Sequence, residues 1–77
     1  MIYEKIASFI KESLKNKELN IELSTILTEL PKWDSFCFID LMVYCENEFN
    51  IKFKPKEIEV IKNIFDLEQI ISIKINE

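Results

Sequence analysis

Histidine and glycine are both absent from this chain of 77 residues, which has only two prolines and two cysteines. Without histidine, the chain lacks the commonest general base and the commonest ligand of transition metals. Without glycine, it cannot form the glycine-rich loops that bind nucleotide phosphates. The scarcity of glycine and proline also disfavours a turn-rich β fold. The composition therefore indicates a small helical protein that enzymes act upon, rather than an enzyme.

The two cysteines, Cys37 and Cys45, are too few for a tetrahedral zinc site without other ligands. Their segment has helical periodicity, so eight residues separate them by about 12 Å of helix rise. A disulfide needs Cα atoms within about 7 Å, so we expect two free thiols.

Targeting signals are not evident in the sequence. The N-terminus lacks the basic start and apolar run of a signal peptide. No apolar stretch approaches the roughly 18 residues that span a membrane. Free thiols fit a reducing compartment, so we expect a cytoplasmic protein.

Apolar residues recur at helical spacing in four segments. They predict helices over about 2–15 and 35–49, a short helix over 56–61 with Pro55 in its first turn, and a helix over 64–75 that Asn63 caps. The predicted fold is all-α: a single domain over 1–77, built as a small antiparallel bundle of three main helices, with a short helix between the last two. The expected core faces are Ile2, Ile6, Phe9, Ile10 and Leu14; Phe38, Leu41, Met42, Cys45 and Phe49; and Ile64, Leu67, Ile71 and Ile75.

Residues 16–34 form the longest connection, after the first helix. They contain too many apolar side chains for a free linker, so we expect them to pack on the bundle. A single helical turn is predicted at 25–29, and Pro31 ends it.

The net charge of −4 is unevenly distributed. Residues 18–50 contain seven acidic residues and one lysine, and residues 33–51 contain four acids and no base. Such a surface repels nucleic acid and anionic membranes and attracts basic patches on partner proteins. The alternative, a merely solvated face, stays open for Glu46 and Glu48.

Asp34 and Ser35 immediately precede the second apolar pattern, and both are residue types that cap helices. A serine there lies beside unpaired backbone N–H groups and the positive end of the helix dipole, which favours a bound phosphate. A serine that only caps the helix is the alternative.

The context of this serine resembles the acyl carrier protein family. The similar features are the Asp34-Ser35 start followed by an apolar residue, Asp40 five residues after the serine, and the stretches Glu46-Asn47-Glu48-Phe49, Asn50-Ile51-Lys52-Phe53, 55–61 and 63–67. With the first helix, the resemblance covers essentially the whole chain. It implies a monomeric carrier, not an enzyme, on which a Mg²⁺-dependent phosphopantetheinyl transferase attaches 4′-phosphopantetheine from coenzyme A to Ser35. It also implies that Asp34 orients the serine or assists the metal, and that loading and transferring enzymes act on a thioester-bound acyl or aminoacyl group.

The chain departs from the family pattern at three places. Leu30-Pro31-Lys32-Trp33 replaces the usual glycine before the Asp-Ser pair, Cys37 replaces an acid, and Phe38 replaces a smaller residue. A Trp-Asp-Ser start is similar to freestanding carriers of specialised pathways. A peptidyl carrier of nonribosomal synthesis and a helical interaction module without a prosthetic group are the alternatives.

Two further sets of residues are candidates for function. Phe36, Ile39 and Val43, with Asp40 beside them, form a second apolar stripe that we interpret as a docking surface; the alternative is that residues 16–34 cover Phe36 and Ile39. A cargo pocket is expected between the second and third helices. Because Phe38 would fill part of this pocket, the expected cargo is short or polar. The expected lining residues are Phe38, Met42, Ile61 and Ile64.

Overall fold

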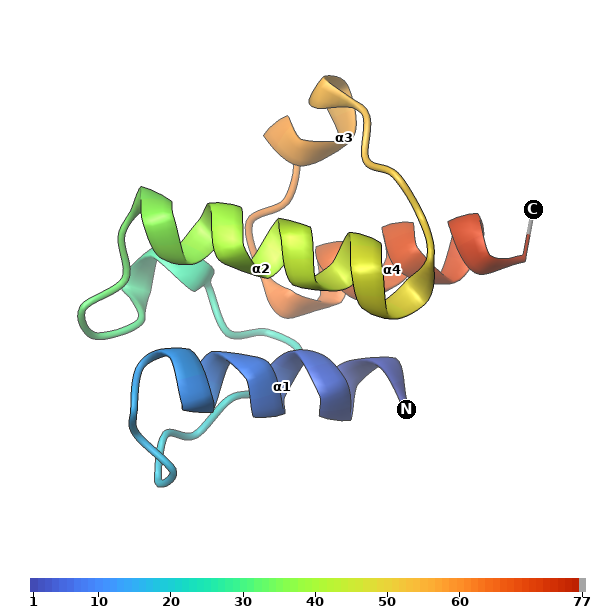
Figure 1. Cartoon of the computed structure of the whole chain (residues 1–77). Coiled ribbons are helices and arrows are strands. Elements are labelled where there is room, and N and C mark those ends of the chain that lie inside the picture. Colours follow the sequence, from blue (N-terminus) through green and yellow to red (C-terminus); the bar gives the residue numbers. More distant parts are fainter. Residues whose placement is uncertain (77) are drawn as a thin grey trace.

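The computed structural model describes residues 1–76, which fold into a small helical bundle (Figure 1). Three long helices, α1 (Ile2–Ser13), α2 (Ser35–Phe49) and α4 (Ile64–Ile75), each contact the other two. The short helix α3 (Pro55–Glu59) precedes α4, and the 3₁₀ turn η1 (Leu27–Glu29) lies in the long connection after α1. The predicted all-α fold, with its short helix and long loop, is confirmed.

The helix directions follow from the two long connections. Helix α1 runs antiparallel to both α2 and α4, whereas α2 and α4 run in the same direction (Figure 1). Residues 50–63, which include α3, carry the chain back along the bundle before α4 begins. In the view of Figure 1, α2 begins beside the end of α1, and α4 begins about midway along α2.

The core lies where the three long helices meet, and most of the residues predicted to face it are buried. Ile2, Phe9 and Leu14 are only partly buried, as are Phe38 and Phe49. Ile75 was expected in the core and is 46% exposed, because it lies in the last turn of α4, one turn beyond the last buried residue. Side chains with no exposed surface come from all three long helices: Ile6, Ile10, Leu41, Cys45, Ile64, Leu67 and Ile71.

The helix ends are defined by backbone geometry and by side-chain caps. Helix α1 ends at Ser13, two residues earlier than predicted, and Lys15 has a positive φ of 54° that no α-helix accommodates. Helix α3 begins at Pro55 and ends at Glu59, two residues before the predicted Ile61. The bounds of α2 and α4 are as predicted.

Asn63 caps α4 as expected. Its side-chain oxygen accepts a hydrogen bond of 2.8 Å from the Asp66 N–H, and the Asp66 carboxylate accepts one of 3.2 Å from the Asn63 N–H. Such a capping box satisfies two N–H groups that the helix leaves unpaired. It also fixes the residue at which α4 begins.

The long connection between α1 and α2 packs against the bundle, as predicted. Ile21, Leu27 and Leu30 are buried, and the Tyr3 hydroxyl donates to the Ile21 carbonyl. The predicted turn at 25–29 is present as the shorter η1. Near it, the N–H of Phe65 donates to the Leu23 carbonyl over 2.9 Å. The connection is therefore attached to α1 at one point and to the start of α4 at another.

Candidate functional site

Ser35 is the first residue of α2, and its side chain is exposed. The N–H groups of Ser35 and Phe36 have no backbone acceptor among the described residues. In a helix of 15 residues, these groups lie at the positive end of the dipole. The serine hydroxyl is thus accessible, and it lies beside two N–H groups at the positive end of the helix dipole, which favour a negatively charged substituent.

Asp34 is the N-cap of α2, with an extended backbone. Its carboxylate accepts a hydrogen bond of 2.9 Å from the Cys37 N–H. This backbone hydrogen bond is the main cause that lowers the pKa of the Asp34 carboxyl below its ordinary value. A carboxylate that stays ionised is a weak base but a good metal ligand, so Asp34 is better suited to capping and cation binding than to removing a proton from Ser35.

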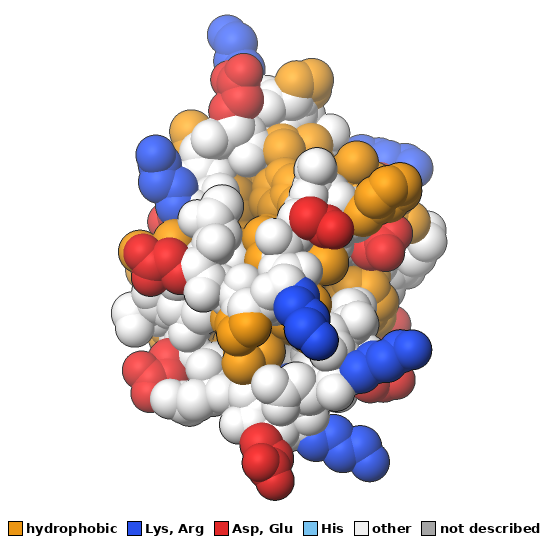
Figure 2. All heavy atoms as spheres, turned by 90° about the vertical axis from the view of Figure 1, so that its left-hand side faces the viewer, with side chains coloured by type: hydrophobic (Ala, Val, Ile, Leu, Met, Phe, Trp, Pro, Cys, Tyr) orange, Lys and Arg blue, Asp and Glu red, His pale blue; other side chains and the backbone are white. Residues whose placement is uncertain are grey.

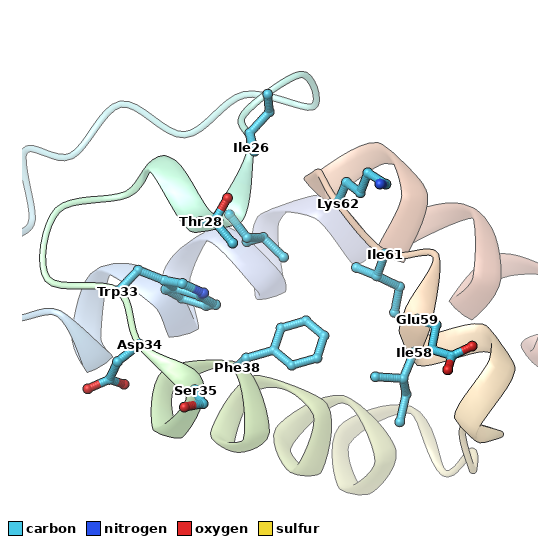
Figure 3. A pocket seen from close by; sticks show the side chains of 11 residues that line it. Ile26, Thr28, Trp33, Asp34, Ser35, Phe38, Ile58, Glu59, Ile61 and Lys62 are labelled. Carbon is cyan, nitrogen blue, oxygen red and sulfur yellow. The ribbon is translucent and has the colours of Figure 1, made fainter.

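An open groove of about 690 Å³ begins at Ser35. Figure 3 shows Trp33, Asp34 and Ser35 at one end, and Ile58, Glu59, Ile61 and Lys62 at the other. The ring of Phe38 projects from α2 between the two ends (Figure 3). The walls come from η1 and the residue before it, from the first turn of α2, and from α3 with the residues after it. The complete lining is Ile26, Leu27, Thr28, Trp33, Asp34, Ser35, Phe38, Ile58, Glu59, Ile61 and Lys62.

Of the four residues expected around a cargo pocket, Phe38 and Ile61 line this groove. Met42 and Ile64 do not, because their side chains point into the core, where they are 6% and 0% exposed. Sequence reasoning missed the wall contributed by η1 and the contribution of Trp33. A sequence signal for Trp33 existed, since a large aromatic residue directly precedes the Asp-Ser pair.

The second apolar stripe of α2 is exposed to solvent. Phe36 is 78% exposed, Ile39 56% and Val43 50%, and Asp40 beside them is also exposed. The alternative that the long connection covers Phe36 and Ile39 is therefore wrong. Val60, directly after α3, is 59% exposed as well. Figure 2 shows the end of the molecule where α2 begins, with hydrophobic side chains gathered between charged groups of both signs.

The two cysteines differ in environment, and both are free thiols, as predicted. Cys37 is half-buried in the first turn of α2. Cys45 lies in the core, where burial raises the pKa of its thiol to about 12. Neither cysteine belongs to a cluster of potential metal ligands, since residues 1–76 contain no group of three or more His, Cys, Asp or Glu side chains that could hold an ion. Within the same range, no helix is both long and apolar enough to cross a membrane.

Acyl carrier proteins are similar to this chain both in sequence and in fold. No protein-family model matches the chain. The chain is 28% identical over 75 residues to an acyl carrier protein from Petrotoga mobilis, covering 97% of this chain and 88% of that protein. The fold matches the solution structure of a holo acyl carrier protein from Geobacter metallireducens with a TM-score of 0.85 and 21% identity, over 97% of this chain and 86% of that one.

The resemblance to acyl carrier proteins is confirmed. A second solved structure, from Mycobacterium tuberculosis, superimposes with a TM-score of 0.84 and 22% identity over 95% of this chain and 97% of that chain. The similarity to acyl carrier proteins spans the whole bundle, including the region of Ser35 and the groove beside it.

Proposed function

We propose that this chain is a carrier domain that bears 4′-phosphopantetheine on Ser35. The observation that carries this proposal is the position of Ser35: an exposed hydroxyl at the N-terminus of α2, after an ionised Asp34, at the mouth of an apolar groove. The prosthetic group would supply a thiol that holds an acyl or aminoacyl group as a thioester. The departures at Trp33, Cys37 and Phe38 favour a carrier of a specialised pathway over one of general fatty-acid synthesis.

Each residue near Ser35 has a role in this proposal. The Ser35 oxygen would form the new phosphodiester bond while the pyrophosphate linkage of coenzyme A breaks and adenosine 3′,5′-bisphosphate leaves. The serine proton would pass to the transferase, since Asp34 is a poor base. The N–H groups of Ser35 and Phe36, which have no backbone acceptor among the described residues, would stabilise the phosphate charge. The Asp34 oxygen that does not accept from Cys37 is available to the Mg²⁺ ion that the transferase uses.

Partner enzymes would bind the exposed face of α2. Phe36, Ile39 and Val43 supply apolar contact area next to the attachment residue. Asp40 supplies a negative charge that attracts basic groups on the partner and increases the rate of association. The partners are a phosphopantetheinyl transferase and the enzymes that load, modify and release the acyl or aminoacyl group.

Intact-mass measurement tests the proposal directly. The purified chain is incubated with coenzyme A, Mg²⁺ and a broad-specificity transferase. We expect a gain of one phosphopantetheine in the wild type and none in Ser35→Ala. Ser24→Ala, which removes another exposed hydroxyl outside α2, is the matched control and should be modified normally. Modification of the Ser35→Ala protein would contradict Ser35 as the attachment residue, whereas no modification of the wild type would favour an interaction module without a prosthetic group.

A further inference from the structure

A second cleft lies where the residues after α1 meet the residues before α2, and it shares no residue with the groove. Its volume is about 170 Å³. Three apolar side chains, two lysines and one asparagine line it: Leu14, Leu19, Pro31, Lys15, Lys32 and Asn16. Because the lining contains lysines and no acidic residue, we call it the basic cleft. Figure 2 faces this end of the molecule and shows basic side chains in its lower half, close to a small hydrophobic cluster.

The basic cleft offers hydrogen-bond donors that are not engaged elsewhere. Among residues 1–76, neither Lys15 nor Lys32 forms an ion pair with a carboxylate. The side-chain oxygen of Asn16 accepts a hydrogen bond of 3.1 Å from the Glu18 N–H, so its NH₂ group is the part that remains for a ligand. Two ammonium groups and one amide can therefore donate to an anion without breaking a described ion pair.

Both lysines of the cleft have a left-handed backbone, with φ of 54° at Lys15 and 63° at Lys32. Glycine adopts this conformation without a steric cost, and asparagine tolerates it. The third residue with positive φ in the described part of the chain is Asn50, the C-cap of α2. At Lys15 and Lys32, the turns account for the conformation but not for the choice of lysine. Non-glycine residues held in this region cluster at functional sites, which indicates a use for the two ammonium groups.

The groove and the basic cleft differ in charge, although both lie near Ser35. The groove is lined by the carboxylates of Asp34 and Glu59 and by a single lysine, Lys62. Asp34 stays ionised because its hydrogen bond to the Cys37 N–H lowers its pKa. The basic cleft has two lysines and no carboxylate. A negatively charged group near Ser35 is thus repelled by Asp34 at the mouth of the groove and attracted to the basic cleft.

We propose that the basic cleft binds the free carboxylate of a short acyl group carried on the Ser35 arm. This inference rests on the proposed function and specifies its cargo as an acyl group with an anionic end. Lys32 precedes Ser35 by three residues, which span at most about 11 Å of extended chain, and the arm is longer than this. Exposed lysines bind a free carboxylate weakly, but a tether raises its effective concentration into the millimolar range and favours occupancy.

Succinyl and butyryl groups test the cleft, because both have four carbons and only succinyl has a free carboxylate. The transferase loads each group onto Ser35 from its coenzyme A thioester. The succinyl carboxylate then attacks its own thioester carbonyl: the C–S bond breaks, the thiolate takes a proton from solvent, and water hydrolyses the cyclic anhydride to succinate. A carboxylate bound to Lys15 and Lys32 cannot attack. At half occupancy, succinyl loss followed by intact mass should be about twofold slower in the wild type than in Lys15→Gln/Lys32→Gln.

A second pair of exposed lysines provides the matched control. Lys52→Gln/Lys56→Gln causes the same change in net charge outside both the groove and the basic cleft, and it should lose succinyl at the wild-type rate. Amide NMR gives a second measurement on the loaded wild type. The Asn16 side-chain NH₂ signals should differ between the succinyl and butyryl forms, and this difference should disappear in Lys15→Gln/Lys32→Gln.

The outcomes separate this inference from the proposed function. Failure to load either group on Ser35 would defeat both. Normal loading, with equal succinyl loss in all three proteins and the same Asn16 signals in both loaded forms, would overturn the basic cleft as a cargo site and leave the carrier function intact. Faster loss in Lys52→Gln/Lys56→Gln alone would place the carboxylate at another surface, and would equally overturn the proposal.

Discussion

The two faces of α2 have similar apolar composition but different environments. Leu41 and Cys45 are fully buried against the other long helices, whereas Phe36 and Ile39 on the other face are 78% and 56% exposed. Apolar side chains grouped in water, without the stabilisation that burial provides, are typical of a surface used for association. Helix α2 thus combines a structural face with a face suited to docking, and Ser35 lies where both begin.

The largest expected difference between the core of α2 and its first turn is in the reactivity of their cysteine thiols. Burial raises the pKa of Cys45 from 9.0 to about 12, which reduces its thiolate fraction at neutral pH by about a thousandfold. Cys37 is half-buried at the start of the same helix. We expect iodoacetamide to modify Cys37 in the folded apo protein and Cys45 only after unfolding, as peptide mass mapping would show. Modification of both cysteines at equal rates in native buffer would mean that the core face opens readily.

Truncation on each face should have a very different effect on stability. Leu41→Ala removes a fully buried side chain, and such changes typically cost about 2–5 kcal/mol in the free energy of unfolding. Ile39→Ala alters a surface site and should change this free energy by no more than about 0.5 kcal/mol. Denaturant midpoints of the two variants and the wild type give the comparison. A large loss in Ile39→Ala would show that something covers this residue in the folded protein.

Sequence periodicity identified the core face of α2 and the limits of this helix, because these depend on local spacing. It left open whether Asp34 or Ser35 caps the helix, and the structure shows that Asp34 does. It left open whether the second stripe was covered, since the position of residues 16–34 depends on contacts made far away in the chain. The groove shows the same limit. Phe38 could be placed because it lies on the second helix near Ser35, and Ile61 because it lies near the short third helix. The η1 wall, in contrast, exists only because Leu27 and Thr25 pair with residues beyond α3. Met42 and Ile64 were assigned to the pocket because a helical pattern does not distinguish a residue above the core from one within it.

A functional measurement on Ile39 tests the proposed docking surface more directly. Truncation of a central interface residue commonly costs more than about 1 kcal/mol, or about a fivefold loss in kcat/KM. We expect Ile39→Ala to reduce modification by the transferase, or transfer to a partner enzyme, by at least this factor while it remains folded. Ile73→Ala, which truncates an exposed isoleucine on α4, is the matched control and should react normally. Equal losses in the two variants would argue against a docking surface on α2.

The smallest expected effect is on the pH dependence of stability, and it comes from Asp34, the N-cap of α2. Because the Cys37 N–H lowers the pKa of Asp34 in the folded chain, the ionised carboxylate stabilises the fold above its unfolded pKa, near 3.8, and this contribution is lost as the pH falls through the lower folded value. Asp34→Asn retains a side-chain oxygen that can cap the helix, but this oxygen does not titrate. The wild type should therefore lose stability relative to Asp34→Asn below about pH 4, while the difference stays constant near neutrality. Denaturant midpoints of both proteins, from below about pH 4 to neutrality, measure this difference in stability. The contributions of the other carboxyl groups cancel in the comparison because both proteins contain them. Parallel curves down to the acid limit would show that the hydrogen bond to Cys37 does not depend on the charge of Asp34.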